Sequence, residues 1–236
     1  MEPTPQLTAR DLEAPARRNE HEGEGATRGT ARMEAFADGV FAIAFTLPIF
    51  NIVLPAIGRS GSVLAQDLWL IWPQYAGYLL SSVIIGLYWV HHHFSGAIYR
   101  TTGHWFLVAT VVFLATIGFI AFPARVFAEN LSDPLAREPA AQYLVLSLAG
   151  VSLAWLLKWS VGRSRGQVDS RLEPAYVDRL NRRYQWMALW NVTAAALSLA
   201  VWPLGLGMAI ASIAFQILPP ETPRYRTEAP TVEGED

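Results

Sequence analysis

The chain has 236 residues, of which 52% are hydrophobic and 16% charged, with a mean hydropathy of +0.24 and a formal net charge of −2. In a soluble domain roughly a quarter of the residues are charged, so this composition favours an integral membrane protein. The absence of cysteine excludes disulfides, thiolate metal sites and cysteine nucleophiles, and the small net charge gives no sign of nucleic-acid binding.

The two ends of the chain differ in composition from the middle. Residues 1–30 contain no aromatic residue, and residues 219–236 are rich in Pro and Glu. Such segments bury too little apolar surface to fold alone. We predict a disordered N-terminal tail at 1–30, a membrane domain at 31–218 and a disordered C-terminal tail at 219–236.

The membrane domain contains several apolar runs. A transmembrane helix needs about 20 mostly apolar residues, and four runs qualify, at 33–54, 68–90, 104–126 and 140–158. The next stretch, 184–218, is too long for one span, and Pro203 divides it into spans at 184–201 and 204–218. The predicted fold class is an all-α integral membrane protein with six transmembrane helices per subunit, and a re-entrant last segment is the alternative.

The placement of Lys and Arg supports this arrangement, because cytoplasmic segments of membrane proteins carry an excess of both. With six spans and both termini in the cytoplasm, 15 of the 18 Lys and Arg residues are cytoplasmic, including Lys158 in the segment that follows the fourth span. Only Arg59, Arg125 and Arg137 are then external. The distribution predicts a multi-pass protein with cytoplasmic N- and C-termini.

The first span carries the most information about function. It begins with the ionisable residues Arg32, Glu34 and Asp38, and ionisable groups in a span indicate a functional site by default. Further along, at helical spacing, five side chains form one narrow stripe: Ile43, Thr46, Leu47, Phe50 and Leu54. The stripe faces either a pore or a partner helix. Asp38 points about 140° away from Ile43, toward neighbouring spans where it needs a hydrogen-bond donor.

Three segments together resemble the bacterial members of the transmembrane protein 175 family of potassium channels. They are Arg32-Met-Glu-Ala-Phe36-Ala37-Asp38-Gly39, Trp89-Val-His-His-His93 and Phe122-Pro123, which match the family's first-helix motif and the ends of its second and third spans. The resemblance weakens beyond residue 130. It implies a six-helix subunit, a homotetramer, and a potassium-permeable pore formed by the first helices, with potassium as the permeant ion and no cofactor.

The resemblance also assigns roles to individual residues. The family's constriction is formed by bulky apolar residues on the first helix, and its positions correspond here to Ile43, Thr46, Leu47 and Phe50, four residues of the stripe found from helical geometry. A structural polar network that fixes the first helix corresponds to Arg32, Phe36, Asp38, Trp89, His92 and His93. The sequence departs from the family pattern at Ala37, which replaces a Ser, and at His91 and Thr110, where relatives often have Asn.

Two further features bear on mechanism. The run His91-His92-His93 suggests metal binding or proton sensing, but adjacent side chains on a helix point about 100° apart, so the three cannot hold one ion together. Pro48 leaves the Ala44 carbonyl without its helical hydrogen bond and is expected to kink the span near Ile43.

The sequence therefore predicts a potassium-selective or potassium-preferring channel in a bacterial plasma membrane, with membrane lipid, potassium ions and other copies of the chain as partners. We expect no enzymatic activity, no catalytic residue and no metal site. The alternatives are a channel or transporter for protons or another cation, a membrane enzyme or metal-binding protein centred on His91 to His93, and a non-conducting scaffold.

Overall fold

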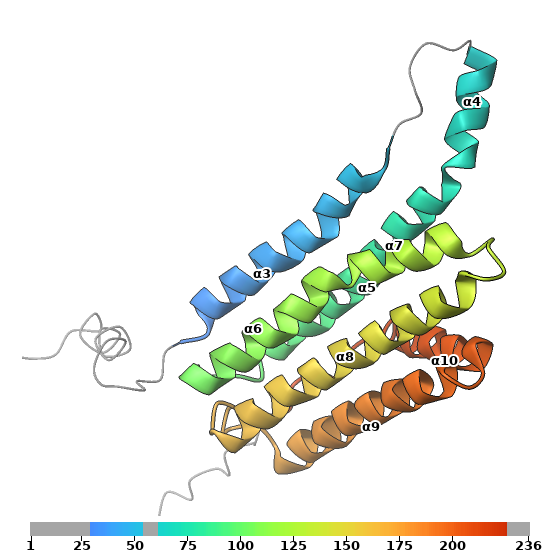
Figure 1. The fold of residues 1–236 in the computed structure, drawn as a ribbon. Coiled ribbons are helices and arrows are strands. Elements are labelled where there is room, and N and C mark those ends of the chain that lie inside the picture. The colour runs from blue at the N-terminus through green and yellow to red at the C-terminus, as the bar shows by residue number, and fades with distance from the viewer. Residues whose placement is uncertain (1–28, 54–60, 226–236) are drawn as a thin grey trace, which may run out of the picture.

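The computed structural model describes residues 29–53 and 61–225, and this part of the chain is helical (Figure 1). Its strand-like pairings are two isolated bridges, Tyr99 with Val168 and Leu172 with Tyr225. The helices, in chain order, are α3 (Ala31–Thr46), the 3-10 helix η2 (Leu47–Asn51), α4 (Gly61–Leu70), α5 (Trp72–Gly96), α6 (His104–Phe119), α7 (Ala121–Asn130), α8 (Arg137–Ser164), α9 (Pro174–Ser198) and α10 (Trp202–Phe215).

The helices form a bundle with α8 near its centre. Helix α8 contacts α6, α7, α9 and α10, whereas α3 lies on one side of the bundle and contacts α5 and α6 (Figure 1). One hydrophobic core joins α3, α5, α6, α7, α8, α9 and α10 through residues such as Phe41, Ile85, Phe113, Leu148 and Ala194. The all-helical class predicted from composition is therefore correct.

Three helical segments in the described residues are long and apolar enough to cross a membrane: Ala31–Asn51, His104–Asn130 and Arg137–Ser164. A fourth is formed if Leu64–Leu70 and Trp72–Gly96, which meet at 47°, count as one broken span. Helix α10 is apolar but shorter, and α9 does not pass the same test. The protein is thus a multi-helix membrane protein, and the count of six spans stays a prediction.

The predicted break between the last two segments is present. Helix α9 ends at Ser198 and α10 begins at Trp202, with Pro203 in its first turn, where a missing N–H costs little. Gly205 then allows the two helices to approach closely, because a Cβ at this position would lie 2.5 Å from the Ala194 carbonyl oxygen. Residues 199–201 form the tight connection.

The third predicted span is longer than expected. We predicted a span at 104–126, with Phe122-Pro123 near its end, but α7 continues to Asn130 after a short interruption at Ile120. Pro123 cannot donate to the carbonyl four residues earlier, which explains the interruption. The amide of Ala124 nevertheless donates to the Ile120 carbonyl at 3.2 Å, so the chain resumes a helical path.

Part of the predicted C-terminal tail has a defined position. The Glu221 carboxylate pairs with Arg179 at 2.8 Å, and the Tyr225 hydroxyl donates to the Ala97 carbonyl at 3.3 Å. The backbone of Arg224 accepts a hydrogen bond from Glu173 at 2.8 Å. Ionic and backbone contacts thus give residues 219–225 a position against the bundle, and the disorder and bounds of the C-terminal tail stay a prediction. Residues 1–28 and 226–236 lie outside the described residues.

Candidate pore-lining site

Helix α3 attaches to the rest of the chain through one face. Met33, Ala37 and Phe41 recur every four residues and are buried against α5 and α6. The Phe41 ring packs 5.4 Å from His92 and 6.1 Å from Phe113. This narrow contact leaves much of the remaining helix surface exposed within the described subunit.

The stripe predicted from helical geometry lies on the exposed surface. Ile43 is 57% exposed, Leu47 53% and Phe50 81%, and Thr46 is also exposed. Leu54 lies outside the described residues. Only 17% of the most apolar stretch of Ala31–Asn51 is buried, against 56% for Arg137–Ser164. An apolar helix that packs so little within its own chain offers its free face to lipid, to another subunit or to a pore.

A cleft of about 610 Å³ runs between this helix and the α6–α7 segment. Ile43, Leu47 and Phe50 line it from one side, and Phe122 and Arg125 line it from the other. Thr46 is absent from the lining. Within the described subunit, the cleft therefore brings together three apolar residues of the stripe without Thr46.

Thr46 and Pro48 shape the end of the helix. The Thr46 hydroxyl donates to the Ala42 carbonyl at 2.7 Å, which leaves its oxygen lone pairs available as an acceptor for a cation. Pro48 stands in the first turn of η2, so the α-helix tightens into a 3-10 helix at Leu47. The kink expected within one continuous span is instead this change of helix type.

Part of the predicted polar network is present. The Trp89 indole N–H donates to the Asp38 carboxylate at 3.0 Å, which supplies the donor that Asp38 was expected to need. The Trp89 ring stacks on His93 with their centroids 5.7 Å apart. Arg32 and Phe36 are exposed, and within the described residues Arg32 forms no hydrogen bond or ion pair. The place of Arg32 in the network stays a prediction.

The three consecutive histidines have different environments. His91 donates from Nε2 to the Gln216 carbonyl at 2.9 Å, because a carbonyl oxygen can only accept. His92 is buried, lies parallel to Phe113 at 6.0 Å, and its Nε2 has no hydrogen-bond partner in the described part of the chain. Because His93 stacks on Trp89, the three histidine rings point toward different partners. The described residues hold no group of three or more His, Cys, Asp and Glu side chains that could bind a metal.

Comparisons with known proteins identify the family. A family model described as the endosomal/lysosomal potassium channel TMEM175 matches residues 32–121. A protein from Chamaesiphon minutus named as a potassium channel is 34% identical over 179 residues, which cover 73% of this chain and 86% of that protein. This chain belongs to the transmembrane protein 175 (TMEM175) family.

Two further relatives agree with this assignment. A protein from Streptomyces collinus, also named as a potassium channel, is 30% identical over 184 residues, which cover 78% of this chain and 84% of that protein. The crystal structure of a lysosomal potassium-selective channel TMEM175 homologue from Chamaesiphon minutus matches with a TM-score of 0.66 and 28% identity, covering 80% of this chain and 96% of that one. The TMEM175 fold therefore extends well beyond the 32–121 segment.

The departures from the TMEM175 motif are accommodated by apolar packing. Ala37, in place of the motif Ser, is completely buried, so no hydroxyl needs a partner there. The Thr110 hydroxyl donates to the Phe106 carbonyl at 2.8 Å and lies 3.7 Å from the Met33 sulfur. These contacts hold α3 against α6 without the polar groups that relatives often carry.

Sequence reasoning misplaced Lys158. It was assigned to a cytoplasmic segment, but it lies inside α8 with only 2% of its surface exposed. Four aromatic rings surround its ammonium at 5.3 to 5.9 Å: Tyr99, Phe106, Phe113 and Trp155. Ring faces attract a cation, which compensates part of its desolvation. The available signal was a lysine within an apolar, aromatic run.

Proposed function

We propose that this chain is the subunit of a homotetrameric potassium channel in a bacterial plasma membrane, with both termini in the cytoplasm and α3 lining the pore. The observation that carries the proposal is the exposed stripe on α3 opposite its buried face. One helix encloses no pore, so an α3 pore needs several copies of the chain. The names of the TMEM175 relatives support potassium as the permeant ion.

The stripe fits the chemistry of a hydrophobic constriction. A ring of Ile43 side chains narrows and dewets the pore, and the layers formed by Leu47 and Phe50 continue the apolar lining toward η2. Thr46 supplies hydroxyl oxygens to an ion that has lost part of its water. The hydrogen bond between Asp38 and Trp89 fixes the start of α3 on α5 and thereby sets the position of the stripe.

Flux measurements test this function. The purified protein, reconstituted in liposomes, is expected to pass potassium faster than sodium and protons. Ile43→Asn places an amide in the constriction and is expected to lower the potassium to sodium ratio. Ile210→Asn is a matched control, because Ile210 on α10 is 56% exposed and Ile43 is 57% exposed.

Two outcomes contradict the proposal. One is a flux ratio that Ile43→Asn and Ile210→Asn change equally, since the effect would then belong to any exposed isoleucine. The other is a strictly monomeric protein in native mass spectrometry. Proton flux without potassium flux would favour the alternative of a proton pathway.

A further inference from the structure

An apolar groove lies between α9 and α10, on the side of the bundle away from α3 (Figure 1). Its volume is about 480 Å³, and apart from Ser212 and one charged residue it is lined by apolar groups, including Trp186, Trp190 and Phe215. Trp186 is 68% exposed, and Trp190 is 44% exposed. In a membrane protein such a groove is covered by lipid chains unless protein fills it.

The charged residue is Arg183, and it lies at one end of the groove. Its guanidinium carbon lies 5.4 Å from the Phe215 ring centroid, and among the described residues it forms no ion pair. Nearby arginines differ, since Arg163 pairs with Asp178 and Arg179 pairs with Glu221. Arg183 therefore carries a cationic group that no carboxylate among the described residues neutralises.

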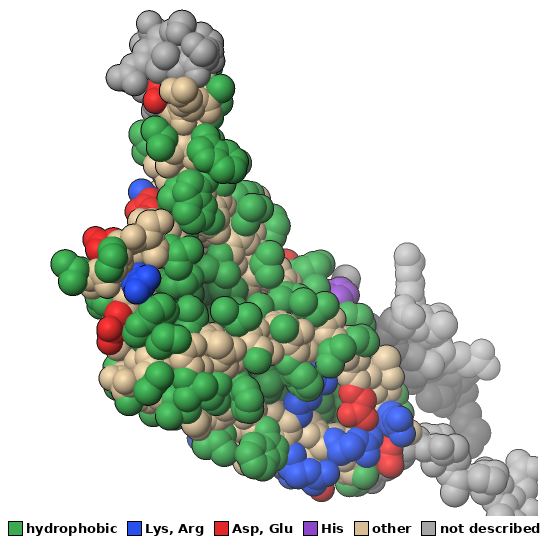
Figure 2. All heavy atoms as spheres, turned by 90° about the vertical axis from the view of Figure 1, so that its right-hand side faces the viewer, with side chains coloured by type: hydrophobic (Ala, Val, Ile, Leu, Met, Phe, Trp, Pro, Cys, Tyr) green, Lys and Arg blue, Asp and Glu red, His purple; other side chains and the backbone are tan. Residues whose placement is uncertain are grey.

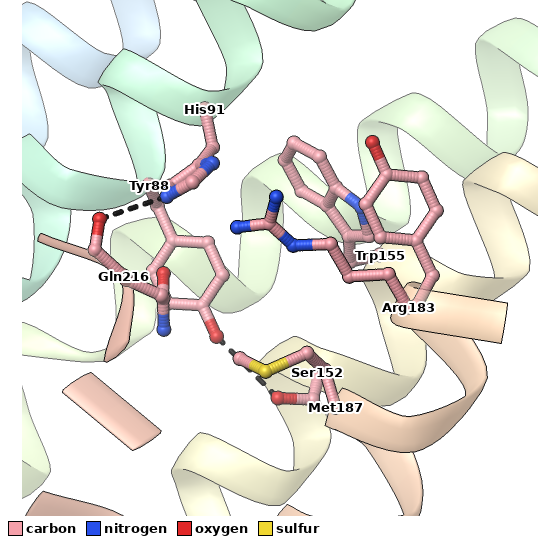
Figure 3. Close-up of a pocket in the computed structure, with 8 residues that line it drawn as sticks. Tyr88, His91, Ser152, Trp155, Arg183, Met187 and Gln216 are labelled. Carbon is pink, nitrogen blue, oxygen red and sulfur yellow. Dashed lines mark hydrogen bonds between the residues drawn. The ribbon is translucent and has the colours of Figure 1, made fainter. Parts of the chain in front are cut away.

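A small pocket, lined by both polar and aromatic side chains, adjoins the groove and shares Arg183 and Met187 with it. In Figure 3 the Arg183 guanidinium points into this pocket, toward the rings of His91 and Tyr88. The pocket holds about 50 Å³, enough for about three or four water-sized groups, and no acidic residue lines it. Its chemistry suits an anionic, oxygen-rich group such as a phosphate.

The location also suits a membrane headgroup. Lys and Arg side chains, with some Asp and Glu among them, gather at one end of the face shown in Figure 2, and apolar side chains cover its middle. From Arg183 to Trp190 the groove runs seven residues along α9, about 10 Å of helix, toward the apolar middle of the bundle. A ligand with one charged end and one long apolar part matches this path.

We propose that the groove and pocket bind one anionic phospholipid, with its phosphate at Arg183 and an acyl chain between Trp186, Trp190 and Phe215. Phosphatidylglycerol is the probe of this class. The site is separate from the proposed pore, so it stands whether or not the protein conducts potassium.

Native mass spectrometry of the full chain, released from detergent with added lipid, measures this binding. Phosphatidylglycerol is expected to bind more tightly than phosphatidylcholine, whose choline cancels the charge. Arg183→Gln is expected to weaken phosphatidylglycerol binding about fivefold, the effect of one basic residue near an anionic surface. The matched control is Arg182→Gln, an exposed neighbour that lines neither cavity.

The acyl-chain half of the site has its own variant. Ala211→Trp fills the groove without changing any charge and is expected to weaken phosphatidylglycerol and phosphatidylcholine binding alike. Equal binding of the two lipids by the wild type overturns the proposal, as does unchanged binding in Ala211→Trp, which is the result if a second copy covers the groove. If Arg183→Gln fails to fold, Arg183→Lys takes its place as the test variant. It keeps the positive charge and should keep the preference for phosphatidylglycerol over phosphatidylcholine.

Discussion

Helices α3 and α8 have similar hydropathy but opposite surroundings. The most apolar 18-residue stretch of Ala31–Asn51 has a mean hydropathy of 1.5 and that of Arg137–Ser164 one of 1.7, yet 17% of the first stretch and 56% of the second is buried in the subunit. Helix α8 is so enclosed that it holds Lys158 inside an aromatic cage. An apolar sequence therefore identifies a membrane span. It does not show whether that span packs against its own subunit, against lipid or against another copy of the chain.

A glycine substitution tests the packed part of the molecule and has the largest expected effect. Gly205→Ala places a methyl group 2.5 Å from the Ala194 carbonyl oxygen and 2.6 Å from the Ser198 Cα, both backbone atoms. We expect the free energy of unfolding, measured in detergent, to fall by about 3 kcal/mol, which is at the upper end of the cost of overpacking a core. Gly207→Ala on the same helix has nothing within 4 Å and is the control. Equal losses of stability in the two variants would show that Gly205 does not lie in a close contact between α9 and α10.

Two phenylalanines compare the two faces of the first helical segment. Phe41 is 2% exposed on the buried face, and Phe50 is 81% exposed on the stripe. In soluble proteins a core Phe→Ala change lowers the free energy of unfolding by about 3–5 kcal/mol. Because lipid compensates part of this loss, we expect Phe41→Ala to lower it by about 2 kcal/mol. Phe50→Ala should leave unfolding of the subunit nearly unchanged. A larger loss for Phe50→Ala would mean that the stripe is a packing surface.

The hydrogen bond that anchors α3 has a smaller expected effect. Trp89→Phe keeps an aromatic ring but removes the donor to Asp38, and we expect a loss of about 1 kcal/mol in a partly exposed position. Faster amide hydrogen exchange in 31–46 is the specific readout. Trp105→Phe is the control, since Trp105 is exposed and its indole N–H donates to no described residue. Unchanged amide hydrogen exchange in 31–46 of Trp89→Phe would show that this hydrogen bond does not anchor α3.

An acid titration probes the connection between α8 and α9 and has the smallest expected effect. Hydrogen bonds from Arg171 lower the pKa of Asp169 from its usual 3.8 to about 2. The stabilisation is complete above about pH 4 and is lost as the pH falls toward 2. Because Arg171 is 66% exposed, we expect the pair to contribute less than about 1 kcal/mol to the free energy of unfolding. Asp169→Asn should flatten the decline in stability between pH 4 and 2, and an unchanged decline would exclude this pair as its source.

Features with a local cause were predictable from the sequence. Pro203 cannot continue a helix and marked the break before α10, and helical periodicity placed Ile43, Leu47 and Phe50 on one stripe. The exposure of that stripe was not predictable, because it depends on which face of α3 contacts α5 and α6.

Features that depend on tertiary contacts were missed. In the sequence Lys158 looks like a charge that flanks a span, and only the fold brings four rings around it, two from α6, one from α8 and one from the loop after α5. The position of 219–225 depends on ionic and backbone partners such as Arg179 and Glu173, far away in the sequence. Arg183 gave no local signal either, because its pocket combines three helices, α5, α8 and α9, with the residue that follows α10.

Thiol modification tests the pore-lining role of α3 most directly, because the natural chain contains no cysteine. Ile43→Cys and the matched Ile210→Cys each introduce a single thiol at an equally exposed isoleucine. After reaction with a small, positively charged thiol reagent, potassium flux through liposomes containing Ile43→Cys should fall sharply, while flux through Ile210→Cys should be unchanged. Full flux through a completely modified Ile43→Cys protein would contradict the account.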